Sequence, residues 1–130
     1  DSTGPRRLEP GTYGLGNHAL DTPLPRLVRA RERFEDALAA DAPGVGELFE
    51  LLADREPATG AALPGSGLPP DLERAMSAPF VLHERYGTRC STVLAIERSG
   101  SAVLVERSFD AAGNATGEAR FQFNIASQRA

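Results

Sequence analysis

Residues 90–109 read CSTVLAIERSGSAVLVERSF, and this stretch decides the fold class of the chain. Its side chains alternate with a period of two on either side of Ser99-Gly100, which is typical of two β-strands joined by a tight hairpin turn. Another alternation places Phe121 and Phe123 on one face of a third strand, after a connecting loop expected over 110–117. The pattern predicts an antiparallel β-meander.

Upstream of the strands, apolar residues recur with a helical period. Three helices are expected, over about 23–41, 45–55 and 71–76, with Thr22 as the N-cap of the first. Amphipathic helices bury their apolar stripe against a neighbouring layer. The sequence therefore predicts an α+β fold in which helices from the N-terminal part pack on one face of the meander.

Between the second and third helices, residues 56–70 contain seven prolines and glycines. This composition disfavours both helix and sheet. We interpret the stretch as a mobile surface loop rather than a domain boundary, because too little chain follows it to build a second domain. Residues 1–130 are thus expected to form a single domain.

Composition excludes several classes of protein. The formal net charge of -4 argues against nucleic acid as a partner, since phosphate binding needs clustered basic residues. Cys90 is the only cysteine, so an intrachain disulfide is excluded and a reducing compartment, the cytoplasm, is expected. No apolar run approaches the roughly 20 residues of a transmembrane helix. The start at Asp1, without a Met or a signal peptide, predicts a fragment of a longer protein.

Two patterns resemble cofactor sites only weakly. Residues 14–19 match G-x-G-x-x-A, the dinucleotide fingerprint, but Asp21-Thr22-Pro23 interrupts the chain where the phosphate-binding helix should run. A glycine-rich strand end is the preferred interpretation. Met76 and His83 could be imagined as haem ligands, but isolated residues of these types usually serve packing or the surface. No cofactor is predicted.

Metal and nucleophile chemistry are also weakly indicated. His18, His83 and Cys90 show no paired-ligand spacing, so no metal site is predicted. Arg89 is adjacent to Cys90, but consecutive strand residues point to opposite faces, and Arg89 would not contact the thiol. We therefore expect Cys90 to be a buried structural cysteine.

Asn17 and Arg89 are the candidate site residues. Each is expected at a junction between a strand and a loop, where polar side chains can point into a cleft. A structural role remains the alternative for both. Asn17 could only satisfy turn amides, and Arg89 could only pair with a carboxylate such as Asp21 or Glu106.

Four segments stand out as motifs: YGLGNH at 13–18, LLADR at 51–55, YGTRCSTV at 86–93 and ERSFD at 106–110. Together they resemble the NRDE family, which includes the transport and Golgi organisation proteins. The resemblance extends from about Thr12 to Phe123, about half of a complete member. Gly16 replaces a common serine and Leu24 a common tryptophan, and the Asn-Arg-Asp-Glu motif is not in this chain.

The resemblance implies a fold and a function. Complete members look similar to N-terminal nucleophile hydrolases, whose αββα sandwich carries a catalytic cysteine at the mature N-terminus. It implies that this chain is the C-terminal part of such an amide (C–N) hydrolase, with Asn17 matching the oxyanion asparagine and Arg89 the late active-site arginine. Asp1 is not a cysteine, so the chain alone is expected to be inactive.

The resemblance also leaves a non-enzymatic alternative, since members of the family are linked to the handling of haem and lipids. In that case the protein would be a haem or lipid binding or trafficking protein. The partners expected are the missing N-terminal half and a small-molecule substrate of unknown identity. A homo-oligomer is also expected, through an apolar sheet face that the missing half would cover.

Overall fold

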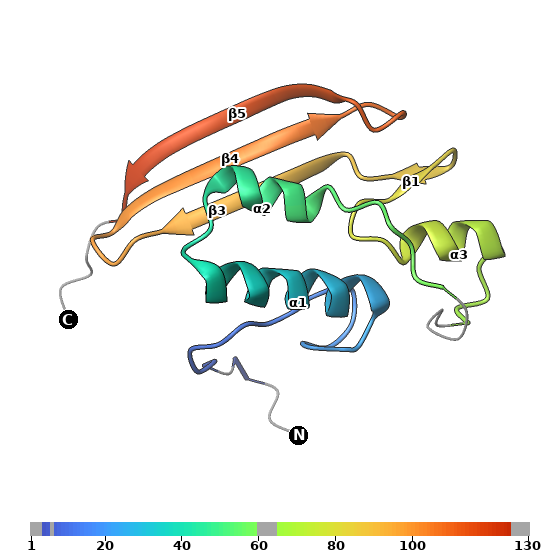
Figure 1. The fold of residues 1–130 in the computed structure, drawn as a ribbon, viewed down its shortest axis with the longest axis horizontal. Coiled ribbons are helices and arrows are strands. Elements are labelled where there is room, and N and C mark those ends of the chain that lie inside the picture. The colour runs from blue at the N-terminus through green and yellow to red at the C-terminus, as the bar shows by residue number, and fades with distance from the viewer. Residues whose placement is uncertain (1–3, 6, 60–64, 126–130) are drawn as a thin grey trace.

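The computed structural model describes residues 4–5, 7–59 and 65–125, in which helices are followed by two antiparallel sheets (Figure 1). This confirms the α+β class. The helices are α1 (Pro25–Ala40), α2 (Val45–Leu52) and α3 (Pro70–Met76). The strands are β1 (Leu82–His83), β2 (Tyr86–Gly87), β3 (Cys90–Ile96), β4 (Ser101–Phe109) and β5 (Ala115–Asn124).

Strands β3, β4 and β5 form the expected meander, in that order and antiparallel throughout. The β3–β4 turn ends at Gly100, whose φ of 89° is a left-handed conformation that favours glycine. Its amide donates to the carbonyl of Glu97 at 2.9 Å. The second turn is shorter than the predicted loop over 110–117, because the Asp110 carboxylate accepts the amides of Ala112 and Asn114 and β5 begins at Ala115.

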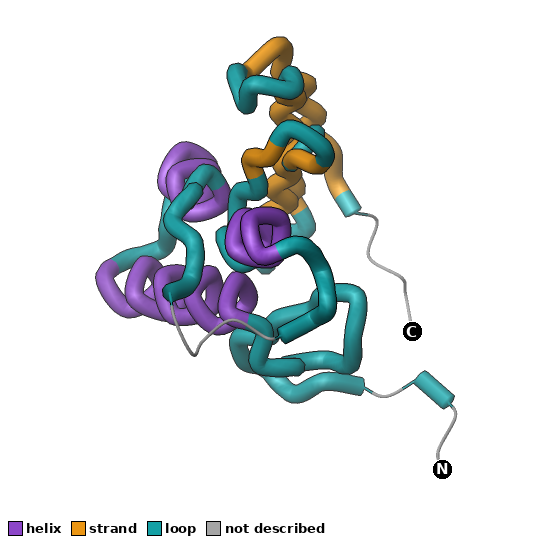
Figure 2. Tube along the Cα trace, turned by 90° about the vertical axis from the view of Figure 1, so that its right-hand side faces the viewer, coloured by secondary structure: helices purple, strands orange, loops and turns teal. Residues whose placement is uncertain are grey.

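The helices lie on one side of the meander, as Figure 2 shows from the side, and α2 covers part of β3 and β4 but leaves β5 exposed. Helix α2 lies against β3, and α1 lies against α2 as an outer layer. The core forms where Phe49 of α2 meets the cross-strand pair of Val93 and Val105, all of them buried. Arg107 of β4 places its guanidinium over the Phe49 ring at 4.1 Å from the centroid. The core thus joins the helices to one side of the sheet.

The other face of the meander is open. Its large apolar side chains remain between 45% and 59% exposed: Leu94, Ile96, Phe121 and Phe123. An apolar strip of this kind is unusual on a surface that only meets water.

Helix α1 begins later than predicted. Thr22 is not its N-cap, because the Thr22 hydroxyl donates to the carbonyl of Ala19 at 2.7 Å and closes a turn instead. The helix starts at Pro25, after Leu24, which makes no side-chain cap. Proline fits the first turn because the amide it lacks has no partner within the helix.

The hairpin of β1 and β2 was missed, since strands of two residues leave no alternation to recognise. Its closure depends on Thr88, whose hydroxyl accepts the amide of Val81 at 2.9 Å while its own amide donates to the Val81 carbonyl at 2.9 Å. These bonds fix the residue that immediately precedes Arg89.

The loop predicted over 56–70 is described only in part, since residues 60–64 lie outside the described residues. On either side, 56–59 and 65–69 contain neither helix nor strand. Both flanks are tied to the α3 region. The amide of Ala58 donates to the Ser77 hydroxyl at 2.7 Å, and the amide of Ser66 donates to the Glu73 carboxylate. The mobility of this loop stays a prediction.

Candidate functional site

Asn17 lies on a closed loop and not at the end of a strand, which corrects the sequence prediction. Gly14 and Asp21 close this loop: the amide of Asp21 donates to the carbonyl of Gly14, and the amide of Gly14 donates to the Asp21 carboxylate, each at 2.8 Å. Asp21 has a φ of 57°, a turn conformation that aspartate tolerates better than most residues. The exposed Asn17 therefore sits within a short loop that is fixed at its base.

The same loop packs on α1. A Cβ atom added to Gly16 would lie 3.3 Å from Cδ1 of Leu27, so a side chain there would press on the helix. Arg31 of α1 also reaches the loop and pairs with Asp21 at 3.3 Å. Helix α1 thus sets the position of the loop that carries Asn17.

Arg89 lies between the β1–β2 hairpin and the meander. The Thr88 bonds hold it on one side, and on the other the Arg89 carbonyl accepts the amide of Phe109 at 2.8 Å. Its side chain is exposed and lines an open groove of about 450 Å³, which we call the Arg89 groove. The groove is also lined by Leu15 and Gly16 of the closed loop and by Arg26 of α1.

Asn17 lines a separate hollow of about 220 Å³. Arg26 lines both this Asn17 hollow and the Arg89 groove. Among the described residues no hydrogen bond joins Asn17 to Arg89, so the structure places them in adjoining hollows and not in contact. Two arginines, Arg26 and Arg89, line the groove, which suits it electrostatically to a carboxylate or another anion.

Cys90 is exposed, so the prediction of a buried structural cysteine is wrong. It shares the open face of β3 with Thr92 and Leu94, whereas α2 covers the face that carries Val93. Cys90 is also one of the residues that line the Arg89 groove. A sulfur nucleophile or metal ligand would need such access, but exposure alone assigns neither role.

The structural alternative for Arg89 does not hold with the partners proposed for it. Asp21 pairs with Arg31, and the Glu106 carboxylate accepts the Thr92 hydroxyl at 2.8 Å. In the part of the chain that the structure describes, Arg89 forms no ion pair with either carboxylate. An arginine placed in a groove by its backbone while its head group remains available is suited to ligand binding.

His83 and Met76, the two residues considered as haem ligands, contact other residues of the chain. His83 contacts the Asp71 carboxylate through Nε2 at 3.1 Å and accepts the amide of Arg85 on Nδ1 at 3.1 Å. Both ring nitrogens are therefore engaged. Met76 ends α3, and its carbonyl lies 3.5 Å from the Arg26 guanidinium. Within the described ranges, no group of three His, Cys, Asp or Glu side chains is arranged to hold a metal ion.

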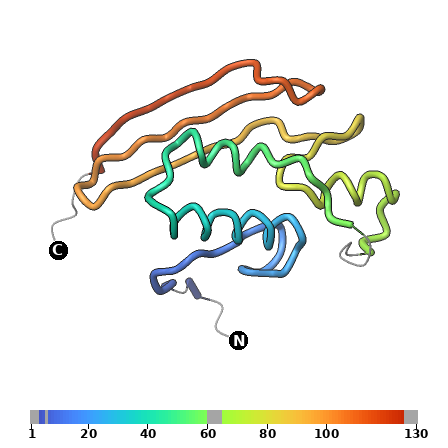
Figure 3. The backbone as a smooth tube through the Cα atoms, in the orientation of Figure 1, coloured from blue at the N-terminus to red at the C-terminus, as the bar shows by residue number. Residues whose placement is uncertain are grey.

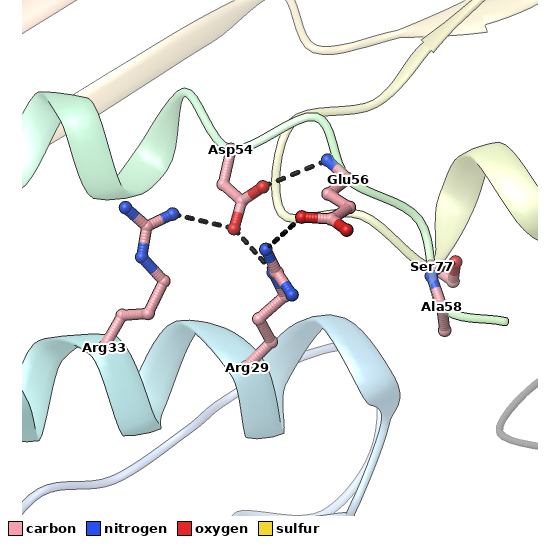
Figure 4. Close-up of polar contacts among 6 residues, drawn as sticks. All are labelled: Arg29, Arg33, Asp54, Glu56, Ala58 and Ser77. Atoms are coloured by element: carbon pink, nitrogen blue, oxygen red, sulfur yellow. Dashed lines mark hydrogen bonds and ion pairs between the residues drawn. The ribbon is translucent and has the colours of Figure 1, made fainter.

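The most buried charged contact belongs to Asp54, which sequence reasoning did not single out (Figure 4). Its side chain is only 6% exposed and accepts Arg29 Nε at 2.6 Å and Arg33 at 2.7 Å. Burial acts to raise the Asp54 pKa, but hydrogen bonds from Arg29, the Glu56 amide and Arg33 outweigh it and hold the pKa at about 2. This contact fastens α1 to the end of α2.

Arg55, the next residue, links the end of α2 to the β4–β5 turn of the sheet. Its guanidinium donates to the carbonyl of Gly113 at 2.7 Å and lies 4.8 Å from the centroid of the Phe80 ring. Phe80 packs edge-on against Phe109 of β4. Thus the LLADR segment of the family resemblance has a structural explanation. In the sequence, the structural role of this segment is indicated only by the adjacent opposite charges of Asp54 and Arg55 where a helix is expected to end.

A third hollow, of about 310 Å³, is mostly apolar and lies between residues 12–15, the two long helices and β3. Its walls include Leu27, Phe34, Leu48 and Leu52, with Arg31 as its charged residue. We call it the apolar hollow. Neither Cys90 nor Arg89 lines it, but it shares Leu15 and Leu27 with the Arg89 groove. It is chemically suited to a ligand with an apolar body.

Among the described residues, none of the helices combines the length and the apolar character that crossing a membrane requires.

Comparisons with known proteins agree with the family resemblance. The family model of Transport and Golgi organisation 2 matches residues 1–111. A Transport and Golgi organization protein 2 homolog of Bos taurus is 34% identical, over 78% of this chain and 40% of the relative. The Mus musculus and Homo sapiens homologs are each 31% identical over the same shares. The chain spans about 40% of the length of these relatives.

Proposed function

Because the chain belongs to the Transport and Golgi organisation 2 family, we propose that it is the C-terminal part of a longer protein that hydrolyses a carbon–nitrogen amide bond in a small anionic substrate. One observation carries the proposal. Asn17 and Arg89, far apart in the chain, line adjoining hollows that share Arg26 as a wall. A substrate that extends from the Asn17 hollow past Arg26 into the Arg89 groove would meet the Asn17 amide and the two arginines.

Each residue has a distinct role in this proposal. Arg89, with Arg26 beside it, binds the substrate carboxylate and sets its orientation. The Asn17 side-chain amide donates to the carbonyl oxygen and stabilises the negative charge that develops there during attack. In this proposal the attacking group comes from a part of the longer protein outside this chain, which spans about 40% of the length of the relatives. The closed loop serves by keeping Asn17 in place before the substrate arrives.

The test uses the longer protein and a panel of amides with and without a carboxylate. Asn17→Ala is expected to lower kcat by about 10²-fold or more, as loss of an oxyanion donor does. Arg89→Ala is expected to raise KM for the carboxylate-bearing amides alone, and Arg89→Lys to recover part of the loss. Arg98→Ala, an exposed arginine in the β3–β4 turn, is the matched control and should leave both constants unchanged.

Circular dichroism must show that every variant is folded. If the variants turn over every amide as the unaltered protein does, the roles given to Asn17 and Arg89 are wrong. Cys90→Ser belongs in the same series. Its complete inactivation would place the attacking group in the Arg89 groove and contradict a nucleophile from outside this chain.

The apolar hollow favours a second candidate function, the binding or trafficking of haem or a lipid. Its volume of about 310 Å³ and its leucine and phenylalanine walls fit part of an apolar molecule. Ala30→Trp on α1 would fill the hollow and should abolish binding of haem or a fluorescent fatty acid. Ala39→Trp, exposed on the same helix, is the control. Equal binding by both variants would remove this candidate.

A further inference from the structure

In the part of the chain that the structure describes, strand β5 has one long edge that pairs with no other strand. It pairs with β4 on one side only and forms the outer limit of the meander (Figure 3). All ten of its residues are exposed. Natural edge strands are usually short or protected by proline, lysine or a bulge. Here neither proline nor lysine occurs over 115–124, and the single irregularity lies where β5 begins, opposite Ser108 and Phe109.

The backbone alternation determines which groups this edge presents. The amide of Ile125 donates to the carbonyl of Gly100, toward β4, so the odd-numbered residues of β5 direct their backbone groups inward. The even-numbered residues therefore direct theirs outward. Glu118, Arg120 and Gln122 thus present backbone donors and acceptors to solvent in a regular row, which another strand could pair with.

We propose that the β5 edge pairs antiparallel with β5 of a second copy of this chain, about a twofold axis through Ala119. The proposal is independent of the proposed function. In this register Glu118 faces Arg120 of the second copy, and Arg120 faces Glu118, so two opposite-charge pairs form on the helix side of the sheet. Sliding the strands by two residues in either direction instead opposes Glu118 to itself or Arg120 to itself. Charge complementarity therefore selects one register.

The two charges are available for this role. Arg120 forms no ion pair among the described residues, whereas Glu118 accepts Arg107 Nε at 2.7 Å. A carboxylate has acceptor sites for more than one donor, so Glu118 can keep Arg107 and also meet the second copy. Because all even-numbered positions hydrogen-bond across the axis, the charge pairs coincide with backbone bonding.

The open face supports the same register. Its odd-numbered positions bring Phe121 opposite Gly117 of the second copy and Phe123 opposite Ala115. An aromatic ring packed over a glycine or alanine covers backbone that the small residue leaves exposed. The open apolar face would then continue across the axis, from Leu94 of one copy to Leu94 of the other.

Sedimentation or light scattering over a range of concentrations tests the association of the 130-residue chain. A dimer is expected. Arg120→Glu places like charges opposite each other twice and should weaken dimerisation by about tenfold. Gln122→Pro removes an outward amide and should give a monomer with its β4–β5 ladder intact, whereas Gln122→Ala should remain a dimer. A monomeric unaltered chain, or equal masses for the two Gln122 variants, would overturn the proposal.

Disulfide trapping tests the register. Ala119 faces itself across the axis as a non-hydrogen-bonded pair, with Cα atoms about 4.5 Å apart, which is within disulfide range. In a Cys90→Ser background, Ala119→Cys should cross-link fully on mild oxidation. Gln122→Cys, which faces Thr116 of the second copy, should not. Cross-linking at Gln122→Cys but not at Ala119→Cys would reject the register.

The same cross-link in a longer protein containing this chain distinguishes the second copy from another occupant. Trapping at Ala119→Cys is expected there too. If the longer protein is monomeric, does not cross-link and protects the outward amides of β5 from hydrogen exchange, a strand of the same polypeptide occupies the edge. That result would overturn the second copy as the partner.

Discussion

The Asp54 carboxylate receives two arginines of α1 while almost fully buried. Its pKa of about 2 lies below the usual 3.8, so ionised Asp54 stabilises the folded chain. The contribution is complete above the unfolded pKa and is lost as the pH falls through the folded one. By linkage it amounts to about 2 kcal/mol.

Asp54→Asn should therefore lower the free energy of unfolding at pH 7 by about 2 kcal/mol or more, because two guanidinium groups lose their carboxylate. The unaltered chain should lose stability between about pH 5 and pH 2, and the variant should lose less over that interval. Urea titrations at several pH values measure both. Asp36→Asn is the control, because Asp36 is exposed on α1, the helix that carries the two arginines. Identical pH profiles for Asp54→Asn and the unaltered chain would contradict this account.

At the residue scale, sequence could indicate which side chains suit a site, but not their surroundings. Asn17 was placed at a strand end because its glycine-rich neighbours suggest extended backbone. The actual loop depends on Asp21, four positions later, and on Arg31 of α1. Cys90 was expected inside because cysteine is usually buried, but both faces of β3 carry apolar residues, and only the packing of α2 decides which is covered.

At the scale of elements, the β4–β5 turn depends on Gly113. Its φ is 76°, and an added Cβ atom would lie 3.0 Å from the Arg55 guanidinium and 3.3 Å from the Phe80 ring. Gly113→Ala should destabilise the fold by about 1–3 kcal/mol, through backbone strain and displacement of Arg55. Thermal or urea unfolding measures this loss.

Gly46→Ala should change the free energy of unfolding in the opposite direction to Gly113→Ala. Gly46 lies in α2 with open space around its Cα, so alanine should stabilise the chain by about 0.5–1 kcal/mol. If both substitutions changed stability in the same direction, the conformational requirement at Gly113 would be wrong.

The bounds of most helices and strands could be predicted where the sequence shows a regular pattern of apolar residues. Strand β3 and helix α2 agree with the sequence within a few residues, because apolar residues recur in each with a regular period. Helix α3 also agrees, although none of its residues is buried. The start of α1 was not predictable from Thr22, whose hydroxyl has a competing acceptor in Ala19. Such competition depends on the turn geometry and not on the residue type.

At the scale of the whole molecule, the two faces of the sheet should respond differently to truncation. Val105 is fully buried in the core, whereas Phe121 is 59% exposed on the open face. Val105→Ala should cost about 2 kcal/mol of unfolding free energy, and Phe121→Ala less than about 1 kcal/mol, despite the larger side chain removed. Urea unfolding at concentrations that keep the chain monomeric tests this order. The reverse order would mean that the open face is covered.

Asp54 and Arg55 are consecutive, yet one holds the helices and the other holds the sheet. A peptide bond is all that separates the two attachments. A displacement of α1 is therefore expected to disturb the β4–β5 turn, and a displacement of that turn is expected to disturb the position of α1. Heating should melt both layers in one cooperative transition. A substitution at this junction would consequently resemble a general folding defect, even though neither Asp54 nor Arg55 lines the Asn17 hollow or the Arg89 groove.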